Sequence, residues 1–261
     1  MAPKQYASLW RTMHQIQDGC GALLWIIQWP KQGIVQDFLD NAVEYIFRKL
    51  EYSNVSVIFD RYFEYSTKSA TRTSRAVQQG SRRHKLTPST PLLAQTIALT
   101  ETENKQQIIS KICEQLQEKG KTRKETAKHR LLVTGPSSVP VEIFKGIVIE
   151  RKDLESTHEE ADVIIPRQVV DVATQGSTCI KVISDDIDMF ILLVYYYQKC
   201  SLTCTLLMES NSKSRTLTDT GATAKQHADI ACQLLAAHAL TVCDTVAFMW
   251  GIGKTKAVKV L

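Results

Sequence analysis

Short apolar runs alternate with segments of helical periodicity along most of this chain. The runs rich in β-branched residues predict buried strands, namely Val55–Phe59, Leu131–Thr134, two runs within residues 139–149 broken by Gly146, Ile180–Ile183, Leu202–Met208 and Thr216–Leu217. The helical periodicity predicts helices at Gly33–Leu50, Asn104–Leu116, Glu159–Thr174, Ile187–Gln198 and His227–Ala239. Strands that alternate with helices predict an α/β domain with a mostly parallel central sheet, and residues 1–261 are expected to form this single domain.

The pattern changes between residues 61 and 130, which are polar, basic and rich in Ser, Thr and Gln. We expect this range to leave the sheet as an excursion, helical in part at Asn104–Leu116. Basic residues dominate from Arg61 to Lys85 and again from Lys119 to Arg130. Such stretches favour a phosphate backbone through counterion release, although most charge runs are simply solvated surface.

Acidic residues recur where the apolar runs end. Asp60 follows Val55–Phe59, and Asp185, Asp186 and Asp188 follow Ile180–Ile183. Because the carboxyl ends of parallel strands meet at one edge of a sheet, these side chains are expected to converge there. A carboxylate cluster is costly unless cations neutralise it, so the pattern indicates metal-dependent chemistry on a polyanion.

Each acidic group also has a simpler interpretation. Asp and Glu are common at helix starts, where they cap the first turn and complement the helix dipole. Capping explains one or two acids of the run around Asp186, whereas Asp186 and Asp188 on an extended strand end would point the same way toward one metal. Glu160 and Asp162 do not share a helix face, so one is expected to reach a metal directly and the other through water.

Composition excludes several other classes. There is no apolar run of about 18 residues and no basic-then-apolar order at the N-terminus, so we expect a nuclear or cytoplasmic protein that neither crosses a membrane nor is secreted. Seven scattered cysteines argue against a disulfide framework, and Cys200 with Cys204 lacks the second pair that a zinc site needs. Phe248 and Lys256 stand where a P-loop and a dinucleotide-binding motif would need glycine.

The last segment carries a glycine pair flanked by lysines. Gly251 and Gly253, followed by Lys254 and Lys256, resemble a helix-hairpin-helix turn that starts seven residues after Asp244. Glycines there let backbone N–H groups approach a phosphate. We therefore expect residues 244–261 to form a shortened helix-hairpin-helix.

Taken in order, these features resemble the flap endonuclease family and the 5′-nuclease domain of bacterial DNA polymerase I, within the PIN-like superfamily. The ordered motifs are Asp18-Gly, Ile58-Phe-Asp60, Glu160-Ala-Asp162, Asp186-Ile-Asp188, Asp244 and Gly251-Ile-Gly-Lys254. The resemblance covers nearly the whole chain and implies a PIN-like fold, with residues 61–130 as a basic, arch-like insertion.

What the resemblance implies is a structure-specific nuclease that hydrolyses phosphodiester bonds in DNA or RNA by a two-metal mechanism. The metal ligands and catalytic residues would be Asp18, Asp60, Glu160, Asp162, Asp186, Asp188 and Asp244. Nucleic acid would be held by Arg72, Arg75, Arg82, Arg83, Gly251, Gly253, Lys254 and Lys256. The cofactors would be two Mg²⁺ ions, replaceable by Mn²⁺, with a K⁺ ion at the Gly251–Gly253 hairpin.

The expected partner is nucleic acid, DNA ahead of RNA, bound by a monomer. The chief alternative is a catalytically impaired PIN-like module that binds nucleic acid or protein. A nucleotide-dependent ATPase or oxidoreductase is disfavoured by the failed glycine motifs.

Overall fold

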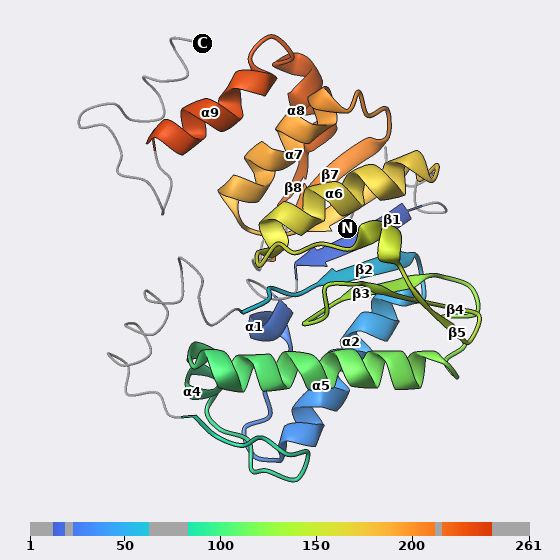
Figure 1. Ribbon diagram of the computed structural model, residues 1–261, viewed down its shortest axis with the longest axis vertical. Helices are drawn as coiled ribbons and strands as arrows, with labels where there is room; N and C mark the ends of the chain where they lie inside the picture. Colours follow the sequence, from blue (N-terminus) through green and yellow to red (C-terminus); the bar gives the residue numbers. More distant parts are fainter. Residues whose placement is uncertain (1–12, 19–22, 63–82, 212–215, 242–261) are drawn as a thin grey trace.

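The computed structural model describes residues 13–18, 23–62, 83–211 and 216–241. Eight strands in this part of the chain form one sheet in the order β5-β4-β3-β2-β1-β6-β7-β8, with helices on both faces (Figure 1). The strands are β1 (Met13–Asp18), β2 (Asn54–Ile58), β3 (Leu131–Thr134), β4 (Val141–Phe144), β5 (Ile147–Glu150), β6 (Cys179–Ile183), β7 (Thr205–Glu209) and β8 (Leu217–Asp219). The helices are α1 (Leu24–Ile26), α2 (Val35–Leu50), α4 (Gln95–Thr100), α5 (Thr102–Gly120), α6 (Ala161–Thr174), α7 (Ile187–Lys199), α8 (Thr220–Gln226) and α9 (Ala231–Thr241), with a 3₁₀ turn at Lys152–Leu154.

The centre of the sheet is parallel, as the alternation of strands and helices predicted. β1 lies between β2 and β6 and is parallel to both, and β3 and β7 continue the parallel pairing outward. The antiparallel strands β4, β5 and β8 complete the two edges. Lys145 and Gly146 both have positive φ angles, 51° and 76°, so the β4–β5 hairpin closes through a tight two-residue turn.

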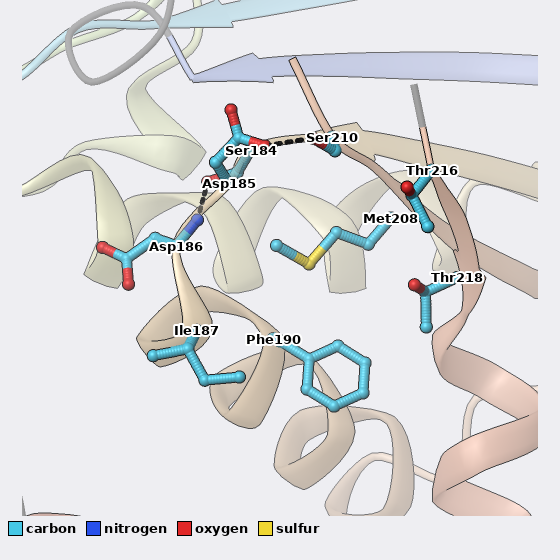
Figure 2. A pocket seen from close by; sticks show the side chains of 9 residues that line it. All are labelled: Ser184, Asp185, Asp186, Ile187, Phe190, Met208, Ser210, Thr216 and Thr218. Atoms are coloured by element: carbon cyan, nitrogen blue, oxygen red, sulfur yellow. Dashed lines mark hydrogen bonds between the residues drawn. The ribbon is translucent and has the colours of Figure 1, made fainter. Parts of the chain in front are cut away.

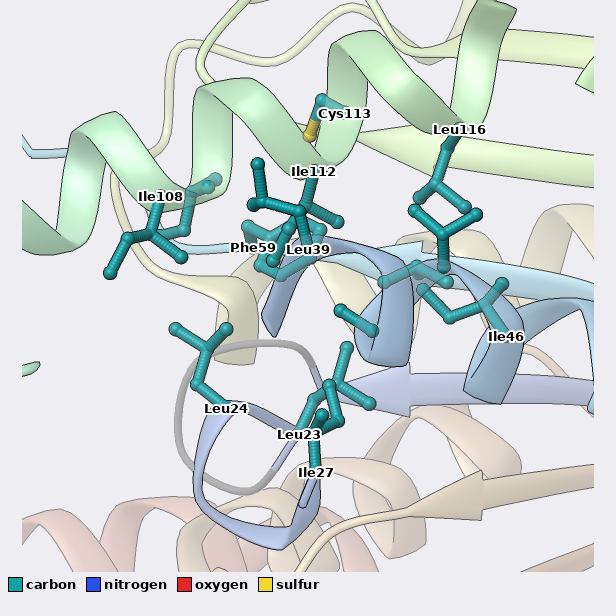
Figure 3. Packing of buried hydrophobic residues seen from close by; sticks show 14 of the residues in the cluster. Leu23, Leu24, Ile27, Leu39, Ile46, Phe59, Ile108, Ile112, Cys113 and Leu116 are labelled. Carbon is teal, nitrogen blue, oxygen red and sulfur yellow. The ribbon is translucent and has the colours of Figure 1, made fainter. Parts of the chain in front are cut away.

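One face of the sheet is covered by α2 and α5. In α2 the buried residues recur at helical spacing, including Phe38, Val43, Ile46 and Leu50, so a single stripe of the helix meets the sheet. From α5, Ile112 and Leu116 pack into the same cluster of buried side chains (Figure 3).

The opposite face is covered by α6, α7 and α8. Ile16 and Ile58 project from the central strands into this second cluster of buried residues, where they join Ile165 of α6 and Leu193 of α7. Helices on both faces bury the parallel strands and leave the strand ends as the places where polar side chains can gather.

The structure differs from two expectations. Residues 83–130 belong to the α/β layers, because α5 is the helix that connects β2 to β3 and its apolar side is buried. The expected excursion and arch therefore stay a prediction for residues 63–82, which lie outside the described part. The single helix expected at His227–Ala239 is wrong at its start, because His227 follows α8 in a turn and α9 begins only at Ala231.

Candidate functional site

The carboxyl ends of β2, β1 and β6 lie side by side at one edge of the sheet. Asp18 ends β1 opposite Ile58, and Gln17 is opposite Ile183 of β6. Neighbouring strands are about 4.8 Å apart, so the ends of β2 and β6 are separated by roughly 10 Å. At this edge the backbone of Asp18 lies close to the segments that carry Asp60 and Asp186. The side chain of Asp18 lies outside the described part of the structure.

Asp60 connects the end of β2 to the start of α6. Its Oδ1 accepts a hydrogen bond from the backbone N–H of Ala161 at 2.9 Å, and the N–H of Arg61 donates to the carbonyl of Glu159 at 2.7 Å. These two bonds place Glu160 and Asp162, the residues that open α6, beside Asp60. Sequence reasoning had linked these three acids, and the structure brings the segments that carry them together.

Arg61 supports this connection from inside the protein. The residue is only 2% exposed. Its guanidinium donates to the carbonyl oxygens of Gly135 at 3.1 Å, of Ser138 and His158 at 3.3 Å each, and of Ser156. Burial lowers the pKa of Arg61 from its ordinary value.

The assignment of Arg61 to a basic surface stretch is therefore wrong. Backbone carbonyls in the loop between β3 and β4 and in the loop before α6 need donors, and a guanidinium offers five in a planar fork. Arg61 satisfies several of these carbonyls at once, which is why this charged side chain lies inside the protein.

The acids after β6 have separate roles. Asp186 caps α7, because its Oδ1 accepts from the N–H of Asp188 at 2.8 Å. Asp185 accepts from the hydroxyl of Ser210 and from the N–H of Asn211 at 3.0 Å, so it ties the end of β7 to the end of β6. Capping, the simpler interpretation, is thus confirmed for Asp186.

Asp188 has a partner that the sequence did not indicate. Nε2 of His238, on α9, lies 2.6 Å from Oδ1 of Asp188, and the His238 side chain is 9% exposed. The contact depends on how α9 packs against α7, and no local pattern around His238 predicts that packing.

A pocket of about 380 Å³ opens beside Asp186 (Figure 2). Phe190 and Met208 form apolar parts of its lining, and the hydroxyls of Thr216 and Thr218 lie on the β8 side. An apolar pocket with a few polar groups at the carboxyl end of a parallel sheet is a typical place for a ligand.

The chemistry of the donor set fits Mg²⁺. The candidate ligands are all carboxylates, which hard divalent cations prefer, and Mg²⁺ is commonly held by one or two carboxylates together with waters. Within the described residues, no group of three or more His, Cys, Asp or Glu side chains is arranged to hold a metal ion.

Several candidate residues lie outside the described part of the chain. They are Asp244, Arg72, Arg75, Arg82, Gly251, Gly253, Lys254 and Lys256. Arg83 is described: its Nε lies 3.6 Å from Oε1 of Glu101, and its side chain is 78% exposed. Arg83 is thus a surface cation next to α4 and α5.

Comparisons with known proteins identify no family for this chain: no protein-family model matches it, and no curated protein sequence matches it. Among the described helices, none has both the length and the apolar character needed to cross a membrane.

Proposed function

We propose that this chain is a metal-dependent nuclease of the PIN-like type that hydrolyses phosphodiester bonds in DNA or RNA. The observation that supports the proposal is the meeting of acid-bearing segments from β1, β2, β6 and the start of α6 at one sheet edge, shown by the strand registers and by the Asp60–Ala161 bond. The order of these segments matches the order of the acidic motifs in the family that the sequence resembles.

In this proposal the protein positions carboxylates around a phosphate. The N–H of Ala161 orients the carboxylate of Asp60. The N–H of Asp188, at the start of α7, orients the carboxylate of Asp186. Divalent ions bound to such carboxylates would supply an activated water and neutralise the charge on the phosphate and the leaving oxygen. The substrate binds across the sheet edge, where α6 and α7 both begin.

A second function, a binding module without catalysis, is favoured by one contact. Nε2 of His238 contacts Oδ1 of Asp188, and Asp188 is one of the proposed metal ligands. If this contact persists when nucleic acid binds, Asp188 has fewer oxygens to offer a metal, and the chain would bind nucleic acid without cleaving it.

The test is cleavage of labelled flap, hairpin and single-stranded substrates, in DNA and in RNA, with Mg²⁺ or Mn²⁺. The wild type should cleave at least one substrate. Asp186→Asn combined with Asp188→Asn should lower the rate by roughly 100-fold or more, because it removes two anionic ligands while asparagine still caps α7. Binding of the substrate should persist in the double variant.

The matched control removes two carboxylates elsewhere. Asp40→Asn with Glu44→Gln makes the same change of charge on α2, where Asp40 pairs with Lys119 of α5 and Glu44 pairs with Arg123 in the segment after α5. This variant should cleave like the wild type. Salt-sensitive binding by the wild type with no cleavage of any substrate would instead support the binding module.

A further inference from the structure

A groove of about 410 Å³ lies between α2 and the strands β6 and β7. Its floor includes Lys181 of β6 and Glu209 of β7, and its wall includes Arg48, Lys49 and Tyr52 from α2 and the turn after it. Side chains alternate between the two faces of a strand. Lys181 therefore faces away from Ile180 and Val182, which pack under α6 and α7, and the groove lies on the opposite face from those helices.

The lining of this groove has an excess of positive charge. Nζ of Lys181 lies 2.7 Å from Oε2 of Glu209, and this pair is largely buried. The charges of this pair offset each other, and Arg48 and Lys49 add two positive charges to the lining. Nζ of Lys49 lies 5.0 Å from the centroid of the Tyr45 ring. Within the described part of the chain, the exposed Arg48 has no hydrogen-bond or ion-pair partner. The groove is thus suited to an anionic ligand.

Two other features of the lining indicate what kind of anion. Tyr52 is 70% exposed, which is unusual for a large aromatic side chain, and it stands close to Arg48 in the chain. Among the described residues, the buried Nδ2 of Asn211 has no hydrogen-bond acceptor. Cations that meet phosphates, together with an exposed aromatic ring that stacks on bases, are the means by which proteins hold single strands.

The groove also leads to the candidate site. Ser210 lines both this groove and the pocket of Figure 2, and its hydroxyl donates to Asp185. The end of β7 is therefore the point at which the basic groove meets the acidic sheet edge. A strand that lies in the groove would pass over Ser210 and Asn211 to reach Asp186.

We propose that this groove binds a single strand of nucleic acid and directs it to the carboxylate edge. Arg48 and Lys49 contact phosphates, Tyr52 stacks on a base, and Asn211 donates to a phosphate oxygen. The choice of ligand class rests on the proposed function, whereas the location rests on the charge and shape of the groove.

The experiment measures the binding of a fluorescent single strand of about 12 nucleotides by anisotropy over a series of salt concentrations, without divalent metal. Each phosphate contact to a single strand contributes about 0.7 to the slope of log affinity against log salt. Arg48→Ala with Lys49→Ala should reduce the slope by about 1.4, which corresponds to about a 25-fold loss of affinity near 0.1 M salt. Tyr52→Ala should weaken binding about five-fold or more with little change in slope.

The control is Lys124→Ala with Lys128→Ala, which removes two exposed cations in the segment between α5 and β3. This variant should keep both the affinity and the slope. Equal losses in the two double variants would overturn the proposal, since binding would then depend only on net charge. Full competition by millimolar inorganic phosphate would also overturn it, because the groove would then be a site for a small anion.

Failure of the groove and failure of the proposed nuclease give different results. If the wild type binds the strand through Arg48 and Lys49 but never cleaves, the groove stands and the nuclease fails. If the wild type cleaves and the Arg48→Ala, Lys49→Ala variant binds and cleaves as well as the wild type, the nuclease stands and the groove fails.

Discussion

At the scale of single residues, neighbours in the sequence have very different roles. Asp60 faces the sheet edge and bonds to α6, while the next residue, Arg61, is buried among carbonyl oxygens. Arg61 was expected in a basic surface stretch, because charged residues are usually exposed. What the sequence does not show is the set of loop carbonyls that Arg61 satisfies, since these lie more than seventy positions away in the chain.

The central strand β1 contains polar residues that are buried. Nε2 of His14 lies 2.9 Å from the hydroxyl of Ser56, and Gln15 donates to the hydroxyl of Ser53 at 2.8 Å. Desolvation of the buried ring lowers the pKa of His14 to about 4. His14 is therefore neutral in the folded protein at physiological pH.

This depressed pKa predicts a loss of stability in mild acid. The unfolded chain takes up a proton on His14 near pH 6.5, and the folded chain does so only near pH 4. The free energy of unfolding therefore contains the full contribution of neutral His14 above pH 6.5 and loses this contribution as the pH falls from 6.5 to 4. Between about pH 7.5 and about pH 4.5, the free energy of unfolding of the wild type should fall by roughly 2–3 kcal/mol more than that of His14→Gln. Urea unfolding at both pH values measures the difference. Equal decreases in the two proteins would show that His14 does not titrate in this way.

At the scale of elements, periodicity predicted most helices and strands, with ends shifted by a few residues. The apolar spacing within α2 and α5 is regular, and β3 was predicted at Leu131–Thr134, where it is found. The break between α8 and α9 was missed because residues 227–230 contain neither glycine nor proline, the usual signals of a helix end. The turn between α8 and α9 depends on tertiary packing, which helix propensity does not describe.

The contact of α5 with the end of β3 is close enough to test by substitution. A Cβ at Gly135 would lie 2.6 Å from Sγ of Cys113. Gly135→Ala should therefore lower the free energy of unfolding by about 1–3 kcal/mol, the usual cost of overpacking. In a Cys113→Ala background the cost should shrink, because the obstructing sulfur is gone.

The measurement is a double-mutant cycle by urea unfolding. Additive costs for the two substitutions would contradict the predicted clash. Burial raises the pKa of Cys113 to about 12, so this thiol stays protonated, and its effect in the cycle is one of volume.

At the scale of the whole molecule, the strand order decides which acids meet. With β1 between β2 and β6, the ends that carry Asp18, Asp60 and Asp186 become neighbours. The sequence predicted the alternation of strands and helices and placed acids at strand ends. It did not predict the contacts of Asp185 with Ser210 or of Asp188 with His238, because these depend on how distant elements pack.

If these acids repel one another at the sheet edge, divalent cations should stabilise the fold. A ligand that binds only the folded state at about 100 times its Kd adds about 2.7 kcal/mol. Mg²⁺ should therefore raise the Tm of the wild type as its concentration increases, and Asp60→Asn with Asp186→Asn should abolish the effect. The Asp40→Asn, Glu44→Gln control should respond like the wild type. An unchanged Mg²⁺ response in the Asp60 and Asp186 variant would exclude these carboxylates as ligands.

The bond from Asp60 to Ala161 joins residues 101 positions apart, and the contacts of Arg61 with Ser156 and His158 span similar distances. Contacts between such distant residues form slowly, because a long loop must close before they stabilise anything. During synthesis, the half that contains β2 leaves the ribosome well before α6 exists. The candidate site is thus assembled late, because Asp60 and Arg61 can form these contacts only after residues 156–161 have been synthesised.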